Sequence, residues 1–303
     1  MRVLVASLLL AFACDAFAHE PPADALLATV PFLEYPEPHR VVVDLAPEGR
    51  RPLVFIVDTG ATHTVATPRA AAELGIRVRR HKRDPYRRKT RLGRDVQILV
   101  DARSSDTASK TGWEYALLGG QFLSHYVVEF DFGFRRMRFF DRKKYEIPEQ
   151  VDAPDEVVLP LRMRQNRPAV ETRIQGRPTL TLIDTGAQPP LVVSGKVADA
   201  ADLARSAGER FEMHGVMGAM TAELARTDPL ELGPFRFAGV PTIVLPKGWY
   251  NQGLSSGSVI GYELLAQFTV RLDYARKRMW LKRRERAQLT FGGEPVVPVA
   301  ADD

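Results

Sequence analysis

The sequence predicts an all-β chain that folds as two related lobes with a few short helices, and the main reason is an internal repeat. Residues 54–61 read Val-Phe-Ile-Val-Asp-Thr-Gly-Ala, and residues 180–187 read Leu-Thr-Leu-Ile-Asp-Thr-Gly-Ala. Each stretch is an apolar run with β character that ends in Asp-Thr-Gly-Ala. An aspartate directly after a buried strand must be paired or used in chemistry. Two such stretches in one chain indicate a duplicated unit.

The repeat continues downstream of these two stretches. The first half contains Leu117-Leu118-Gly119, and the second half contains Val259-Ile260-Gly261. An aspartate, Asp131 or Asp273, follows each of these glycines at the same spacing along the chain. Each half is therefore expected to contain a hairpin, a strand that ends in Asp-Thr-Gly, a variable middle, an apolar-apolar-Gly element and a closing hairpin.

The first half is predicted to consist of strands with one short helix. Thr67 suits an N-cap, Pro68 suits the first helical position and Gly75 suits the C-terminal stop, so a helix is expected between them. The remaining elements read as strands. Residues 40–45 and 52–57 are expected to form one hairpin, and residues 127–131 and 137–140 another. The other predicted strands are residues 27–33, 96–102 and 113–118.

A strongly basic stretch interrupts the first half. Residues 77–94 hold ten lysines or arginines, and two interpretations remain open for them. Charge runs are usually solvated faces, which favours a solvated hairpin. The alternative is a patch that attracts anions. Tyr86 is the one aromatic residue in the stretch, so base stacking on nucleic acid is a poor fit.

The second half repeats this organisation after a proline-containing, acidic segment that reads as a linker. A helix is expected within residues 194–207 and is expected to end near Gly208. Residues 213–219 have the glycine-rich, apolar composition of a hairpin tip, and an ordinary hairpin turn explains them equally well. The predicted strands are residues 157–162 and 169–174, two strands within 230–245, and a closing unit at 259–281.

This arrangement resembles the aspartic peptidases, and the retropepsin-like branch most closely. The resemblance covers roughly residues 40–283 and implies a bilobed acid-protease fold whose two β lobes are related by a pseudo-two-fold axis within one chain. It implies that Asp58 and Asp184 are catalytic. It assigns supporting positions to Thr59, Gly60, Thr185, Gly186, Gly119 and Gly261, and a possible substrate-covering flap to Tyr86, Gly215, Val216, Met217 and Gly218. The threonines are implied to cross-link the two loops by hydrogen bonds.

The chemistry of a carboxylate pair supports this expectation. Two carboxyl groups within hydrogen-bond reach hold one proton between them and titrate in two coupled steps. The charged member can deprotonate a water while the protonated member hydrogen-bonds a carbonyl oxygen. No metal or cofactor is expected, because the histidines show no paired helical spacing and the reaction needs none. Which aspartate is the base stays open at this stage. Gln188 departs from the repeat, because Thr62 occupies the equivalent position.

The N-terminus reads as a secretory signal peptide. An apolar run at residues 3–13 follows Arg2, and Ala16-Phe17-Ala18 is a small-x-small cleavage site, so the mature chain is expected to begin at His19. A lipoprotein anchored at Cys14 is the disfavoured alternative. Cys14 is the single cysteine, so the mature chain would have no disulfide or thiol chemistry. We expect a periplasmic or secreted bacterial protein with no membrane span.

The domain boundaries and partners follow from these expectations. The divisions are a signal peptide at 1–18, an N-terminal lobe with Asp58 at 19–147, a linker at 148–156, a C-terminal lobe with Asp184 at 157–283, and a tail at 284–303. We expect a monomeric aspartic endopeptidase that acts on peptides or proteins and binds no nucleic acid. Two alternatives remain open: a catalytically silent peptide-binding protein on the same fold, and an unrelated secreted β-sandwich binding module.

Overall fold

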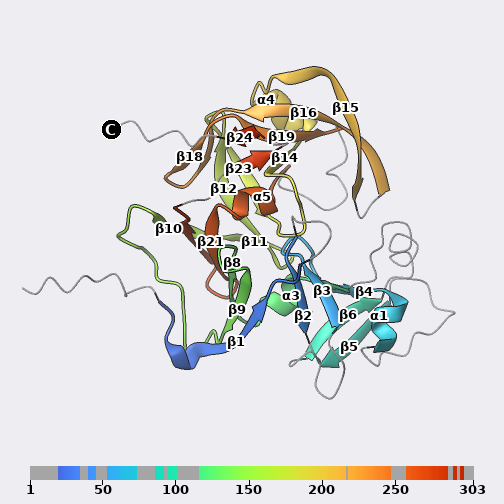
Figure 1. Ribbon diagram of the computed structural model, residues 1–303, viewed down its shortest axis with the longest axis vertical. Coiled ribbons are helices and arrows are strands. Elements are labelled where there is room, and N and C mark those ends of the chain that lie inside the picture. The colour runs from blue at the N-terminus through green and yellow to red at the C-terminus, as the bar shows by residue number, and fades with distance from the viewer. Residues whose placement is uncertain are drawn as a thin grey trace, which may run out of the picture.

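A computed structural model describes residues 20–34, 40–45, 53–73, 86–91, 95–100, 116–215, 218–246, 257–285, 289–291 and 294–296. The predicted signal peptide, most of the basic stretch, and Val216 and Met217 of the possible flap lie outside these residues. The described part is built almost wholly from strands, with short helices at a few loops (Figure 1). This confirms the all-β, bilobed prediction.

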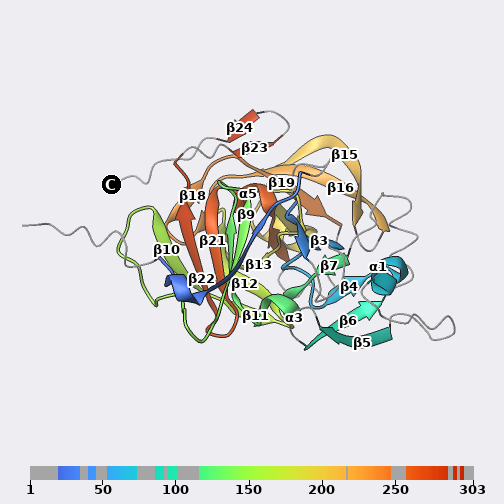
Figure 2. The same cartoon turned by 60° about the horizontal axis from the view of Figure 1, so that its bottom comes forward.

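A six-stranded antiparallel sheet contains strands from both halves of the chain. Its order is β1 (Leu26–Pro31), β9 (Arg136–Phe140), β8 (Val127–Asp131), β21 (Phe268–Asp273), β22 (Arg278–Arg283) and β10 (Glu156–Pro160). Three strands come from each half, and β8 meets β21 in the middle. The two views show this sheet beside the lobe sheets, with the N-terminal lobe on one side and the C-terminal lobe on another (Figures 1 and 2).

The N-terminal lobe adds a second six-stranded sheet. Its order is β2 (Val42–Leu45), β3 (Leu53–Val57), β7 (Ala116–Leu118), β4 (Thr64–Ala66), β6 (Asp95–Val100) and β5 (Tyr86–Arg91). Helix α1 (Pro68–Glu73) follows β4, and the Thr67 hydroxyl accepts a hydrogen bond from the Ala70 N–H at 3.1 Å, as the predicted N-cap requires. The four-residue helix α3 (Gly120–Leu123) follows β7.

The C-terminal lobe contains a larger sheet of the same plan. Its order is β15 (Arg205–Gly215), β16 (Gly218–Thr227), β19 (Val240–Leu245), β14 (Leu191–Ser194), β20 (Ser258–Ile260), β13 (Arg177–Ile183), β12 (Arg167–Ile174), β17 (Leu230–Leu232) and β18 (Phe235–Phe237), with β11 (Arg162–Arg164) paired to β12. Helices α4 (Gly195–Ala200) and α5 (Tyr262–Leu265) follow β14 and β20. A 3₁₀ turn (Ala23–Ala25) and a small β23–β24 hairpin (Leu289–Phe291, Glu294–Val296) complete the described part.

The internal repeat is visible in the backbone hydrogen bonds. Strand β3 pairs in parallel with β7, and β13 pairs in parallel with β20. The Asp58 N–H donates to the Leu118 carbonyl at 3.0 Å, and the Asp184 N–H donates to the Ile260 carbonyl at 2.9 Å. The apolar-apolar-Gly element of each half therefore fixes the backbone of the aspartate in the same half.

Several boundaries differ from the sequence predictions. The helix predicted within 194–207 ends at Ala200, and Arg205 already belongs to β15, so the predicted end near Gly208 is wrong. Asp202 has φ of +52°, a left-handed conformation that stops the helix and turns the chain. The predicted strand at 157–162 is divided between β10 and β11, which lie in different sheets. The stretch 230–245 holds three strands instead of two.

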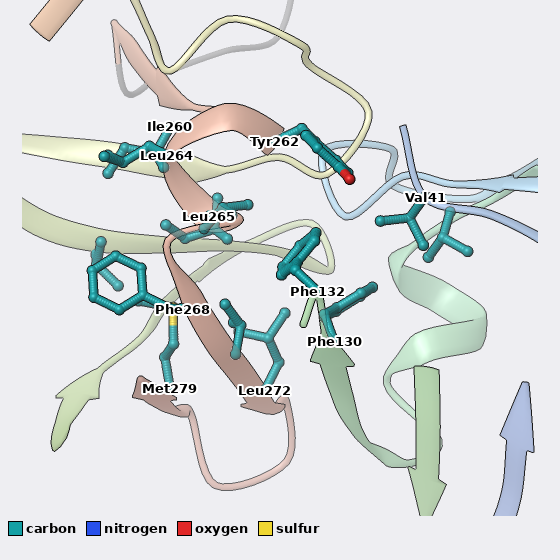
Figure 3. Packing of buried hydrophobic residues seen from close by; sticks show 14 of the residues in the cluster. Val41, Phe130, Phe132, Ile260, Tyr262, Leu264, Leu265, Phe268, Leu272 and Met279 are labelled. Carbon is teal, nitrogen blue, oxygen red and sulfur yellow. The ribbon is translucent and has the colours of Figure 1, made fainter. Parts of the chain in front are cut away.

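The hydrophobic core joins the two halves (Figure 3). Phe130 and Phe132 of the first half pack together with ring centroids 6.3 Å apart, and Phe132 contacts the Tyr262 ring of the second half edge-on at 5.2 Å. All three side chains are almost wholly buried. Because Tyr262 directly follows Gly261, this contact ties the second half's apolar-apolar-Gly element to the closing hairpin of the first half.

Candidate active site

The two Asp-Thr-Gly loops meet where the lobes join, and their threonines hold them together. The Thr59 hydroxyl donates to the Ile183 carbonyl at 2.7 Å, and the Thr185 hydroxyl donates to the Val57 carbonyl at 2.6 Å. Each hydroxyl oxygen also accepts the other threonine's N–H, at 3.0 and 3.2 Å. Both side chains are fully buried. These four bonds join the backbones of the two loops symmetrically.

The loop glycines bring each loop against the aspartate of the other. A Cβ placed on Gly60 would lie 2.3 Å from Oδ2 of Asp184. A Cβ placed on Gly186 would lie 2.6 Å from Cγ of Asp58. Both distances are far below van der Waals contact, so a side chain at either position would displace a carboxyl group. The absence of a Cβ is what lets the two carboxyl groups come together.

Gly119 and Gly261 support the loops from beneath. A Cβ on Gly119 would lie 2.2 Å from the His63 carbonyl oxygen, and a Cβ on Gly261 would lie 2.2 Å from the Pro189 carbonyl oxygen. The next residue in each half donates its N–H to the loop: Gly120 to Ala61 at 2.8 Å, and Tyr262 to Ala187 at 2.7 Å. The loops therefore rest directly on backbone, which restricts their movement.

The carboxyl groups of Asp58 and Asp184 form one coupled pair. Burial and the negative charge of Asp184 raise the pKa of Asp58 well above its usual range, and a hydrogen bond to Asp184 raises it further. Burial also raises the pKa of Asp184, whereas the hydrogen bond from Asp58 lowers it. Two carboxyl groups this close retain a proton between them at pH values where an isolated aspartate is ionised.

The two carboxyl groups receive different numbers of hydrogen bonds from backbone N–H groups, so they differ in how strongly they favour the charged form. An Asp184 carboxylate oxygen accepts the N–H groups of Gly186 at 2.8 Å and Ala187 at 3.2 Å, whereas Asp58 accepts that of Ala61 at 2.8 Å. The Gly60 N–H lowers the pKa of both aspartates. Hydrogen bonds donated to a carboxylate favour its charged form. The arrangement therefore favours a proton on Asp58 and a negative charge on Asp184.

Two titratable residues, one interacting with the pair and one beside the second loop, were not found by the sequence reasoning. Arg167, at the start of β12, is half-buried; burial lowers its pKa, while the charges of Asp184 and Asp58 raise it. Its Nε donates to the Arg164 carbonyl at 3.2 Å. Burial raises the pKa of Glu263, in α5, to about 7, and a hydrogen bond to Gln188 lowers it. Gln188, which departs from the repeat, thus contacts a titratable group next to the second loop.

The two possible flaps occupy equivalent places in their lobes. Strand β5 pairs with β6, which runs parallel to β4, and β16 pairs with β19, which runs parallel to β14. Tyr86 is the first residue of β5. Gly215 pairs with Gly218 where β15 and β16 meet, so the described backbone there is a hairpin. Strands β5 and β16 therefore hold equivalent places in the two lobe sheets, and their role as flaps stays a prediction.

Neither a metal site nor a membrane span emerges from the described residues. Among them, no group of three or more histidine, cysteine, aspartate or glutamate side chains could hold a metal ion. Within the same ranges, no helix is long and apolar enough to cross a membrane.

Comparison with known proteins identifies the family. The family model described as aspartyl protease matches residues 43–107 and 170–264, which together make up more than half of the chain and include both Asp-Thr-Gly loops. The chain therefore belongs to the aspartyl proteases. No curated protein matches the chain.

Three solved structures are similar to the chain at low identity. A retropepsin-like aspartic protease from Rickettsia conorii is 17% identical over 42% of this chain and 89% of its own, with a TM-score of 0.31. An aspartic proteinase from Irpex lacteus is 13% identical over 85% of this chain and 97% of its own, with a TM-score of 0.47. Basic 7S globulin from soybean is 14% identical over 84% of this chain and 94% of its own, with a TM-score of 0.44.

Proposed function

We propose that the protein is an aspartic endopeptidase in which Asp58 and Asp184 activate a water molecule for attack on a peptide bond. The single observation that carries this proposal is the symmetric hydrogen bonding of Thr59 and Thr185, which holds two acidic loops against each other at the lobe junction. A purely structural role for two buried carboxyl groups would be costly, because burial disfavours the charged form of both.

The inequality of the two carboxyl groups suggests their roles. Asp184, which favours the charged form, takes a proton from the water, while the protonated Asp58 donates its proton to the carbonyl oxygen of the scissile bond. The resulting tetrahedral hydrate carries no net charge. Asp184 then gives its proton to the departing amine, the carbon–nitrogen bond breaks, and the hydroxyl that received the Asp58 proton returns it as the carbonyl re-forms. The pair ends in its starting state.

The substrate is proposed to be an unfolded or extended stretch of protein, and the enzyme is proposed to act as a monomer. An extended peptide can pair with an edge strand, and the two lobe sheets end in the edge strands β5 and β15. Both halves of the site come from one chain, so no second copy is needed to complete it. We also propose export through the signal peptide at residues 1–18, which a periplasmic or secreted peptidase would require.

Removal of one carboxylate at a time tests this function. Asp58→Asn and Asp184→Asn should each reduce turnover of an unstructured protein substrate by at least about three orders of magnitude, because an amide cannot share the proton. Asp44→Asn is the matched control, since Asp44 is exposed on β2. Substantial turnover by either folded variant would contradict the mechanism. Binding of peptide by a wild-type protein that never cleaves it would favour the silent peptide-binding alternative.

A further inference from the structure

Tyr274 and Phe132 occupy equivalent positions in the repeat. Each follows the aspartate that ends the first strand of a closing hairpin, and that aspartate binds a backbone N–H in the turn, at 3.1 Å for Asp131 and 3.0 Å for Asp273. In each turn the third residue after the equivalent aromatic has a left-handed backbone, with φ of +50° at Arg135 and +58° at Lys277. The equivalent aromatic side chains therefore differ by a single hydroxyl group.

The surroundings of Phe132 show that the fold has no need of that hydroxyl. Phe132 is 6% exposed and packs against the rings of Phe32, at 5.9 Å, and Tyr262, at 5.2 Å. These contacts are apolar. Tyr274 is buried to the same degree, at 5% exposed. Its hydroxyl oxygen is fully buried and has no hydrogen-bond partner among the residues that the structure describes. A buried hydroxyl without a partner is unfavourable, so its retention at this position calls for a physical reason.

The repeat also indicates what lies beside Tyr274. Phe132 is covered by Tyr262, whose N–H supports the second Asp-Thr-Gly loop. The residue equivalent to Tyr262 is Gly120, which supports the first loop and has no side chain. A Cβ on Gly120 would lie 1.9 Å from the Asn166 carbonyl oxygen, so the β11–β12 turn occupies that place. The two halves therefore differ here: the Tyr262 ring covers Phe132, whereas the β11–β12 turn takes the equivalent place beside Tyr274.

The electrostatics place the hydroxyl within the field of both candidate catalytic groups. The pKa of Tyr274 is raised by burial first, and then by the negative charges of Asp58 and Asp184. The group therefore keeps its proton at every pH at which a peptidase would work, and it is a permanent hydrogen-bond donor. Arg167 of β12 also interacts with both aspartates, and Glu263 of α5 contacts Gln188 beside the second loop.

We propose that Tyr274 is a positioning residue whose hydroxyl donates toward the Asp58–Asp184 pair through a bridging water, because no described residue accepts a direct hydrogen bond from it. Such a donor favours the ionised carboxylate and sets the pH range in which the pair carries a single proton. The kinetic consequences rest on the proposed function. The effect on titration of the pair requires only that the two aspartates are coupled.

Tyr274→Phe tests the proposal because it removes one oxygen atom and keeps the ring. Without the donor, the apparent pKa values of the pair rise, so both limbs of the pH profile of kcat/KM should move upward by about half a pH unit or more. Tyr145→Phe is the matched control. Tyr145 is a similarly buried tyrosine, 8% exposed, and its hydroxyl accepts a hydrogen bond from Arg271 at 3.3 Å. Both limbs should stay in place in that variant.

Thermal stability as a function of pH is a second measurement that does not need activity. Because the carboxyl pKa values are raised in the folded protein, Tm should fall as pH rises through the folded pKa values, and Tyr274→Phe should move this fall to higher pH. Asp58→Asn gives the baseline without the coupled pair. The proposal would be overturned if wild type and Tyr274→Phe had the same pH profile of kcat/KM and the same dependence of Tm on pH. A shifted Tm curve in a protein without peptidase activity would support it and reject the proposed function instead.

Discussion

Glu129 and Arg271 face each other directly across the junction of the two halves, although they occupy equivalent positions in the repeat. They are register partners where β8 meets β21, and Arg271 Nε lies 2.5 Å from Oε2 of Glu129. Both side chains are almost fully buried. Glu129 also binds Arg138 at 2.5 Å, and the Arg271 guanidinium stacks 4.1 Å from the centroid of the Trp280 ring. If two copies of the first half paired through β8 in the same way, Glu129 would lie opposite a second Glu129, and two like charges directly opposite each other are unfavourable.

This pair is therefore expected to specify how the lobes join. Glu129→Ala should destabilise the protein by about 3 to 5 kcal/mol, because it removes the buried counter-charge of Arg271 and leaves only the exposed Glu20 carboxylate, 3.6 Å from Nη2. The exchange Glu129→Arg with Arg271→Glu should recover part of that loss. Denaturant unfolding measures both variants. Lys144→Ala, which removes an exposed pair with Asp24, is the control and should cost less than about 1 kcal/mol. Equal losses in the control and in Glu129→Ala would contradict this role.

The sequence repeat could have revealed this pair only in part. Glu129 lies two residues before Asp131, and Arg271 lies two residues before Asp273, so their equivalence is readable from the spacing. Their contact is not readable, because it depends on β8 and β21 being neighbours in a sheet. Arg167 was missed for the same reason, since its proximity to the aspartates is a tertiary contact. The Asp-Thr-Gly loops were predictable because their strand, turn and glycine are contiguous.

The short helices were missed for a different reason. Helices α3 and α5 have four residues each, which is about one turn and too short for a hydrophobic period to be recognised. The division of residues 157–162 into β10 and β11 was missed because the apolar pattern continues through it, although Pro160, which ends β10, lacks the N–H that a continuous strand needs. In contrast, the α1 cap at Thr67 was predicted correctly, because capping depends on adjacent residues.

The threonine hydrogen bonds are expected to position the aspartates more than they stabilise the fold. Thr185→Val keeps the shape of the side chain but removes a bond to Val57 and an acceptor for Thr59. We expect a loss of about 1 to 3 kcal/mol in stability from unpaired buried groups. We expect kcat to fall more than KM changes, because the carboxyl pair loses its alignment. Thr185→Ser retains the hydroxyl and is the matched control. A variant without the hydroxyl but with wild-type kcat would refute this assignment.

The close approach at Gly60 predicts a large effect from one methyl group. Gly60→Ala places a Cβ 2.3 Å from Oδ2 of Asp184, so the carboxyl group or the loop must move. We expect peptidase activity to fall at least about a hundredfold, since small displacements of reacting groups have effects of this size. Gly133→Ala is the control, because its Cβ would meet Nε of the Arg284 side chain at 3.2 Å, and that side chain can shift. Wild-type activity in Gly60→Ala would show that the pair tolerates separation.

The raised pKa values of the aspartates predict that the candidate site destabilises the protein at neutral pH. A carboxyl group whose pKa is raised on folding binds its proton more tightly in the folded state. Its stabilising contribution is present below the unfolded pKa, near 4, and is lost as pH rises through the folded pKa. Both Asp58 and Asp184 shift in this direction, so the folded state carries an increasing penalty as the pair ionises.

Asp58→Asn should relieve that penalty, because the remaining Asp184 no longer faces a second negative charge. Above the folded pKa of the pair, we expect the variant to be more stable than wild type by about 1 to 3 kcal/mol, while it loses activity. Below pH 4 the difference should shrink, since the wild-type pair is then protonated. Calorimetric Tm values measured across this range, with Asp44→Asn as the exposed control, decide the point. A variant that is less stable than wild type at neutral pH and unchanged at low pH would mean that the ionised pair contributes favourably to folding.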